Sequence, residues 1–287
     1  MHIHYLILAH KNLNQTDRLI RALEGKETTF YVHVDKKINA GELKKTDFFR
    51  RSDVKIIKNR KNVSWGGYSI VAATLDLMRL ALAERRQGYV VLLSGQDFPL
   101  RHNDSIRTRL AKDYGSEYLH FWQIPHHKWD NGGVDRFSYF WFVDQIGIER
   151  SWNLYFLQKE NGLIRNYFDD FPPFGGSQWW CLTTECIAYI LRFLKYNPVF
   201  SEFFETTLIP DEMFFHTIII NSEFKDCVTN DNLRYIVFED EKDHPECLVE
   251  SDFESLTGSN KLWARKFDVN LDCEVLDRLE AHIDLNR

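Results

Sequence analysis

Short apolar runs recur along the first third of the chain and alternate with segments of helical periodicity. The runs cover residues 3–9, 29–34, 54–57 and 89–93. Each is rich in β-branched or aromatic residues, which is typical of buried strands in a parallel sheet covered on both faces. The alternation predicts an α/β fold in which right-handed crossovers join parallel strands.

The clearest helical pattern covers residues 68–86, where apolar side chains recur at i, i+3 and i+4. A shorter helix is predicted over residues 13–23. The remaining predicted elements are helices over 183–196, 211–221 and 273–283 and strands over 177–182 and 235–238.

Between residues 121 and 174 the periodicity is lost among aromatic, histidine and glycine residues, as in HHKWDNGG and FPPFGG. We expect long excursions over an active face in this segment. The whole chain, 1–287, is predicted to form one domain. Residues 1–120 would be a nucleotide-binding half, and residues 121–287 an acceptor and catalytic half.

The composition restricts the function classes. Apolar residues make up 44% and charged residues 27%, as in ordinary globular proteins, whereas the aromatic share of 15% suits a large core or a sugar platform. A net charge of −6 with scattered basic residues argues against nucleic acid as a partner. Five cysteines without a C-x-x-C pair favour a reducing compartment. Because the first apolar run is too short to span a membrane, we expect a cytoplasmic protein.

Polar side chains follow three of the predicted strands. His10 follows the first strand, Asp35 and Lys37 follow the second, and Asp97 follows the fourth. Ligands of open α/β sheets bind beyond the carboxyl ends of the strands, so these residues are candidates for binding a nucleotide. An aspartate at such a position either binds ribose hydroxyls or a uracil N–H, or acts as a cap or turn former, and both interpretations stay open.

Two aromatic segments carry further candidates. SWGGYSI places Trp65 before two glycines and a helix, which suits either a ring beside a base or a core tryptophan at a glycine-rich helix entry. KLWARKFD places Arg265 and Lys266 side by side. They could clamp a diphosphate, because arginine offers a planar fork and lysine a compact charge, or they could form a solvated basic pair.

Asp211 and Glu212 follow a proline and precede a strongly apolar run in LIPDEMFFHTII. Acids in the first turn of a helix complement its positive end, worth about 0.3–1 kcal/mol per charge. A carboxylate beside such an apolar helix is also a candidate general base, because lost solvation raises its pKa. The motif alone leaves both interpretations open.

Metal-binding patterns are missing from the sequence. No two aspartates stand two apart, there is no H-E-x-x-H motif, and adjacent histidines such as His126 and His127 more often do not bind metal. We therefore expect neither a metal nor another cofactor. Fixed cations, Arg265 and Lys266, would then stabilise a leaving group.

Eight segments in order resemble the core-2/I-branching β-1,6-N-acetylglucosaminyltransferase family, which includes the peptide O-xylosyltransferases. They are YLILAHKN (5–12), YVHVDKK (31–37), VSWGGYSIVAATLDLMRLAL (63–82), YVVLLSGQDFPLR (89–101), GGSQWWCLT (175–183), IPDEMFFHTIIINSEF (209–224), NLRYIVF (232–238) and LWARKFD (262–268). The resemblance implies a GT-A-type nucleotide-sugar-binding fold with a mostly parallel central sheet flanked by helices. It also implies metal-independent, inverting transfer from a UDP-sugar.

The resemblance assigns roles to individual residues. It makes Glu212 the catalytic carboxylate and Arg265 with Lys266 the diphosphate-binding pair. The other residues that it places at the donor are Asp35, Lys37, Trp65, Asp97 and Arg234.

The acceptor side is less determined. Where xylosyltransferases carry Asp in GGS-D-W, this chain has Gln178, and with Trp179, Trp180 and the aromatic tract around Trp122 and Trp129 it forms the predicted acceptor side. Core packing is the alternative for each aromatic ring. We expect transfer of N-acetylglucosamine to a glycan hydroxyl, with xylose transfer or an inactive glycan-binding protein as alternatives. Peripheral membrane association and the oligomeric state stay open.

Overall fold

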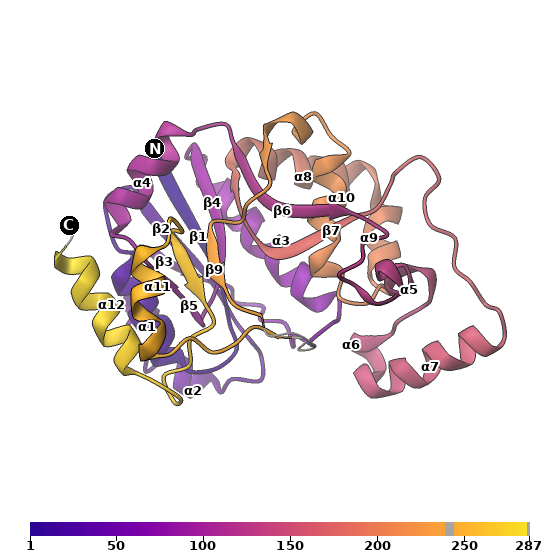
Figure 1. Ribbon diagram of the computed structural model, residues 1–287, viewed down its shortest axis with the longest axis horizontal. Helices are drawn as coiled ribbons and strands as arrows, with labels where there is room; N and C mark the ends of the chain where they lie inside the picture. Colours follow the sequence, from indigo (N-terminus) through magenta and orange to yellow (C-terminus); the bar gives the residue numbers. More distant parts are fainter. Residues whose placement is uncertain (239–243, 286–287) are drawn as a thin grey trace.

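The central feature of the computed structural model is a sheet of seven strands in the order β3-β2-β1-β4-β7-β6-β8 (Figure 1). The structure describes residues 1–238 and 244–285. The strands of this sheet are β1 (His2–Ala9), β2 (Thr28–Val34), β3 (Val54–Ile56), β4 (Gly88–Ser94), β6 (Glu117–Gln123), β7 (Phe174–Thr183) and β8 (Val228–Thr229). β1 to β4 are mutually parallel, and β7 runs antiparallel between β4 and β6. The predicted α/β class with a mostly parallel central sheet is confirmed.

A second sheet of three strands packs beside the first. Its strands are β5 (Asp97–Pro99), β10 (Trp263–Arg265) and β9 (Arg234–Ile236), in the order β5-β10-β9. β10 pairs antiparallel with β5 and parallel with β9. The end of the chain therefore returns to the carboxyl edge of the first half.

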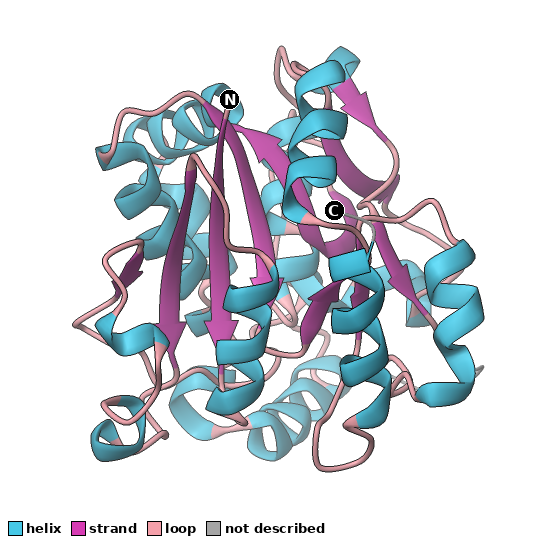
Figure 2. Cartoon of the chain, turned by 90° about the vertical axis from the view of Figure 1, so that its left-hand side faces the viewer, coloured by secondary structure: helices cyan, strands magenta, loops and turns pink. Residues whose placement is uncertain are grey.

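Helices cover both faces of the central sheet, as Figure 2 shows. On one face lie α1 (Leu13–Ala22), α4 (Asn103–Lys112), α11 (Phe253–Gly258) and α12 (Glu274–Leu285). On the other face lie α3 (Ser69–Ala83), α8 (Thr184–Tyr196), α9 (Pro198–Phe204) and α10 (Phe214–Ile220). Short helical segments are α2 (Ala40–Leu43), η1 (Phe48–Arg50), η2 (Asp130–Gly133), η3 (Pro210–Glu212), η4 (Lys225–Cys227) and η5 (Glu250–Asp252).

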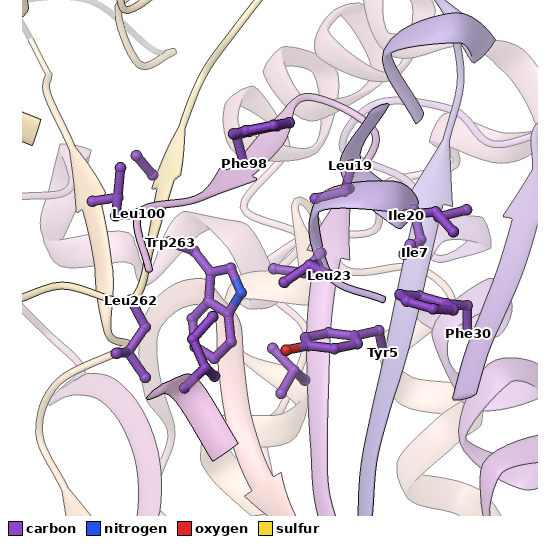
Figure 3. Packing of buried hydrophobic residues seen from close by; sticks show 14 of the residues in the cluster. Tyr5, Ile7, Leu19, Ile20, Leu23, Phe30, Phe98, Leu100, Leu262 and Trp263 are labelled. Carbon is purple, nitrogen blue, oxygen red and sulfur yellow. The ribbon is translucent and has the colours of Figure 1, made fainter. Parts of the chain in front are cut away.

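Each face has its own hydrophobic core because the strand side chains alternate. Tyr5 and Phe30 stack at 5.5 Å on the face of the small sheet, and Trp263 meets the edge of Tyr5 (Figure 3). On the opposite face Trp180 packs against Phe215. Burial on both faces explains why the strands read as continuous apolar runs.

The segment 121–174, which was predicted to make long excursions over an active face, contains regular elements that its sequence did not reveal. It contains the end of β6 and three helices, α5 (Asp135–Ser138), α6 (Val143–Ile146) and α7 (Ile148–Glu160). α7 projects from the body at the side of the molecule away from α12 (Figure 1). Its apolar residues are largely exposed, so no one-sided pattern marks it in the sequence.

The predicted helix over 211–221 is also wrong in its first turn. Residues 210–212 form the separate turn η3, and Met213, with φ −131° and ψ −38°, breaks the path before α10 begins at Phe214. Asp211 and Glu212 therefore do not cap α10. Because the two acids lie in the first turn of η3, directly before α10, their interpretation as helix-terminus acids stays open beside that of a general base.

Candidate functional site

The predicted donor residues gather at one edge of the central sheet. Because β1, β2 and β4 are parallel, their carboxyl ends bring His10, Asp35 and Asp97 to the same edge. β7 runs the opposite way, so its first residues pass this edge too. The convergence predicted from the strand ends is present.

Asp35 organises the loop that leads to Trp65. Its carboxylate accepts hydrogen bonds from the backbone N–H groups of Lys37, at 2.8 Å, and Val63, at 3.3 Å. The Lys37 ammonium lies 3.1 Å from the same carboxylate. Asp35 is thus both a turn former, as one interpretation held, and the anchor of residues 61–65.

The Trp65 loop contacts the segment of Glu212 directly. The carbonyl of Gly66 accepts a hydrogen bond from the backbone N–H of Ile209 at 2.9 Å. Gly66 has φ +77°, a conformation that favours glycine. The Trp65 side chain is 63% exposed, so the core interpretation of this ring is wrong and it is open to a ligand.

Gly67, the second glycine of this loop, allows the Asp144 side chain to come close, a contact that the sequence did not reveal. The Asp144 carboxylate of α6 accepts hydrogen bonds from the backbone N–H of Ser69 at 2.8 Å and from its hydroxyl at 2.6 Å. A Cβ at Gly67 would lie 2.5 Å from an Asp144 oxygen. α6 therefore fixes the start of α3 and, through it, the Trp65 loop.

His10 is exposed at the end of β1, among the charges of the site. Partial desolvation of the ring lowers the pKa of His10, and the charges of Lys11, Lys266 and Arg265 lower it further, while Asp35 opposes this. The ring therefore lies within the electrostatic reach of both predicted phosphate-binding side chains.

Asp97 is completely buried and lies behind Arg265. Its carboxylate accepts hydrogen bonds from the hydroxyl of Ser94 at 2.7 Å and from the Ser94 backbone N–H at 3.2 Å. Burial raises the pKa of Asp97, while Arg265, whose Nε lies 3.7 Å away, acts in the opposite direction. Direct contact between Asp97 and a bound sugar, as predicted, would require this buried group to be uncovered, so we assign it to supporting Arg265.

The Arg265 guanidinium stacks on Trp179, with 4.0 Å between its Cζ and the ring centroid. The Nε and Nη1 atoms are buried and donate no hydrogen bond to any residue within 1–238 and 244–285. The half-buried Gln178, one residue before Trp179, likewise has a buried Nε2 without a partner in this region. Because buried N–H donors without partners are costly, an anion beside Arg265 would relieve that cost.

Two glutamines fix the backbone that carries the basic pair. The side-chain amides of Gln15 and Gln96 both donate to the carbonyl of Phe267, each at 3.0 Å. One residue farther on, Asp268 forms an ion pair with Lys11 at 2.7 Å. These contacts hold residues 265–268 against the loop after β1, and only the fold could reveal them.

Arg234 and Trp180 take structural positions. The buried Arg234 guanidinium donates to the carbonyls of Leu92 at 2.7 Å and Trp180 at 3.1 Å, and also to that of Asn232. Trp180 is completely buried against Phe215. Both side chains are buried and support the two sheets, and their predicted roles toward phosphate and sugar stay predictions.

Glu212 lies at the end of η3, beside the aromatic tract. Arg136 donates from Nη1 to Glu212 Oε2 at 2.8 Å, and its guanidinium stacks on Trp129 at 3.6 Å. Trp129 in turn contacts Trp122 edge-to-face, with ring centroids 5.2 Å apart. Burial and then the charge of Glu212 raise the pKa of the neighbouring Asp211 to about 7. The buried member of the acidic pair is therefore Asp211, whereas the Glu212 side chain is 33% exposed.

Three further features concern metals, membranes and cysteines. Within the described ranges no three His, Cys, Asp or Glu side chains come together as metal ligands. None of the helices in those ranges is long and apolar enough to cross a bilayer. All five cysteines are free thiols.

The chain belongs to the Core-2/I-Branching enzyme family, whose model matches residues 3–257. Xylosyltransferase 1 of Rattus norvegicus is 25% identical over 303 residues, covering 98% of this chain and 35% of the relative. Xylosyltransferase 2 of Canis lupus familiaris is 26% identical over 312 residues, covering 98% and 33%. The chain thus spans about a third of the length of these curated relatives.

Among solved structures, a Bacillus anthracis protein provisionally named a glucose-1-phosphate thymidylyltransferase, in complex with a sucrose, has a TM-score of 0.40 and 10% identity. The alignment covers 98% of this chain and 95% of that one. A score this low supports no conclusion about the site.

Proposed function

We propose that this chain transfers a sugar, N-acetylglucosamine, from a UDP-sugar to a glycan hydroxyl with inversion and without a metal ion. The observation that carries the proposal is the pair of buried N–H donors on Arg265 that have no hydrogen-bond partner among the described residues, at the sheet edge where α/β proteins bind nucleotides. Such donors suit a diphosphate, because arginine binds phosphate oxygens through a planar fork.

The proposed reaction is a single displacement. Glu212 takes the proton of the acceptor hydroxyl, whose oxygen forms a bond to the anomeric carbon as the bond from that carbon to the β-phosphate oxygen breaks. UDP leaves with its negative charge beside Arg265 and Lys266, so the proton ends on Glu212 and the electron pair on the phosphate. A single in-line step inverts the anomeric configuration.

Two hydrogen bonds and the position of Ile209 in the chain support this arrangement. The Asp35 carboxylate holds Val63, the Trp65 loop holds Ile209, and Ile209 precedes the turn of Glu212. The donor edge and the proposed base are thereby joined through a chain of backbone contacts.

Xylose is the second candidate sugar, because the two relatives named above are xylosyltransferases. A thermal-shift panel of UDP, UDP-N-acetylglucosamine, UDP-xylose and UDP-galactose separates the candidates, since a ligand that binds the folded state raises the melting temperature. We expect UDP and one of the first two sugars to stabilise the protein. No stabilisation by UDP would contradict the proposed donor.

Transfer itself is tested by proton NMR of the product formed from the stabilising donor. We expect a β-linked product from an α-linked donor and slow release of free sugar to water. A protein that binds UDP-sugar but leaves it intact with every glycan offered, and also in water, would instead be a binding protein of this fold. Cytoplasmic location and peripheral membrane association remain predictions, which cell fractionation tests.

A further inference from the structure

Arg136 contacts the proposed base and lies outside every motif discussed above. It belongs to α5, and its Nη1 donates to Glu212 Oε2 at 2.8 Å. The Arg136 side chain is 17% exposed and that of Glu212 33%. The pair is therefore shielded enough for its geometry to persist, whereas fully exposed ion pairs contribute little.

The Trp129 ring stacks on the Arg136 guanidinium and holds it in place. The Arg136 Cζ lies 3.6 Å from the centroid of the indole. The ring itself fills a slot between two glycines, because a Cβ at Gly133 or at Gly175 would each lie 2.3 Å from a ring carbon. Real atoms do not approach so closely, so only glycine at both positions leaves room for the indole.

The backbone of Arg136 is tied to the same loop as its side chain. Its carbonyl accepts a hydrogen bond from the N–H of Leu208 at 2.9 Å, four residues before Glu212. The neighbouring acid, Asp135, is engaged elsewhere, with Asn131 at 2.6 Å and Tyr155 at 2.7 Å. Arg136 is thus directed to Glu212 and to no competing carboxylate in its own helix.

We propose that Arg136, held flat on Trp129, is a positioning residue that orients the Glu212 carboxylate for proton transfer. The inference rests on the proposed function, because it assigns a role relative to the base. Arg136 occupies Oε2, so Oε1 is the oxygen left to meet the acceptor hydroxyl. A base held in one orientation avoids the loss of rate that comes from small misplacements.

The expected signature separates kcat from KM. Replacing Arg136 by alanine removes a charge-assisted hydrogen bond, so kcat should fall by about tenfold to a hundredfold. The KM for UDP-sugar should not change, because the donor residues belong to other elements. Arg136→Lys keeps the charge without the planar fork, so its kcat should lie between those of the wild type and Arg136→Ala. Guanidinium chloride at millimolar concentration should restore part of the activity of Arg136→Ala.

The test is a double-mutant cycle of Arg136→Ala with Glu212→Gln, with folding checked by melting temperature. If Arg136 acts through the Glu212 carboxylate, Arg136→Ala should not lower kcat further in the Glu212→Gln protein. Arg278→Ala is the matched control, because Arg278 also stacks on a ring, Phe253, at 3.9 Å and pairs with Glu250 at 3.0 Å. This control should keep wild-type kcat.

The outcomes distinguish the inference from the function on which it rests. Wild-type turnover in Glu212→Gln would overturn both. Slow turnover in Glu212→Gln together with an unchanged kcat in Arg136→Ala would overturn the positioning role alone. The same conclusion would follow if Arg136→Ala slowed the Glu212→Gln protein as much as it slows the wild type.

Discussion

The donor edge and the acceptor side of the molecule are held together by different interactions. At the donor edge, buried polar groups such as Asp97 and Gln96 are bonded repeatedly to the backbone. On the acceptor side the contacts are fewer and the side chains are partly exposed. Arg136 stacks on Trp129 and forms an ion pair with Glu212. The proposed donor edge is therefore held by several buried hydrogen bonds, whereas the proposed acceptor side depends on a few side-chain contacts.

The two regions also differ in their surfaces. The segment from α5 to the start of β7 exposes large apolar side chains, among them Trp152, Phe156, Leu163 and Ile164. The strands and loops of the donor edge expose Trp65, next to the segment of Glu212. Changes that break the donor edge should therefore affect UDP binding, and changes on the acceptor side should affect turnover.

The largest expected effect is that of Glu212→Gln. Removing the base should lower kcat by about 10² to 10⁴ while UDP binds normally, because the donor contacts remain. Steady-state kinetics and calorimetry on the same preparation check the two parts. Glu205→Gln, an exposed acid with the same change of charge, is the control. Unimpaired turnover in Glu212→Gln would remove Glu212 from its role.

The second effect, on the donor side, is that of Lys266→Ala. Loss of a cation from the diphosphate should weaken UDP binding by about tenfold to a hundredfold. Lysine 266 is preferred to Arg265 as a target, because removing Arg265 would also leave the buried Asp97 without its neighbouring cation. Lys225→Ala, at an exposed site, should leave the affinity unchanged. If Lys266→Ala and Lys225→Ala bound UDP equally well, the diphosphate would not contact Lys266.

The third effect tests the slot of Trp129. Gly175→Ala places a methyl group 2.3 Å from the indole, so the ring must move. Overpacking of this kind costs about 1–3 kcal/mol of unfolding free energy, measured by urea denaturation. Gly258→Ala, where a Cβ meets nothing within 4 Å, is the control. If Gly175→Ala were as stable as the control, the ring would not be confined.

A smaller effect concerns the pH dependence of stability. Burial beside Glu212 raises the pKa of Asp211 from 3.8 to about 7, so the folded protein binds this proton more tightly than the unfolded chain does. Asp211 therefore costs stability progressively as the pH rises between these two values. The unfolding free energy of Asp211→Asn relative to wild type should increase over that range. A pH-independent difference would show that Asp211 does not titrate there.

The smallest expected effect is that of a chelator. Transfer should continue unchanged in EDTA, because protein cations are proposed to hold the leaving group. Loss of transfer in EDTA that Mn²⁺ restores would show that a metal ion takes part.

The sequence predicted best those elements whose structure depends on one strand or one motif alone. Continuous apolar runs predicted β1, β2, β3 and β4 within a residue or two, because burial on both faces leaves a local record. The three-residue strands β5 and β10 were not predicted, since their pairing joins residues far apart in the chain. The same distance hides the bonds from Gln15 and Gln96 to Phe267.

The candidate site shows the same division. The strand ends predicted that His10, Asp35 and Asp97 converge, but they did not predict that Asp97 is completely buried beside Arg265. From the sequence, an arginine among apolar strand residues, such as Arg234, could equally bind a phosphate or donate hydrogen bonds inside the protein. Arg136 had no sequence signal, because its partner Glu212 follows 76 positions later.

The most direct test is a crystal structure of the protein with UDP bound, grown in EDTA. The account predicts that Arg265 and Lys266 contact the diphosphate and that the Glu212 carboxylate lines the same cavity, facing the β-phosphate. A structure in which UDP binds away from this pair, or in which Glu212 faces a separate surface, would contradict it.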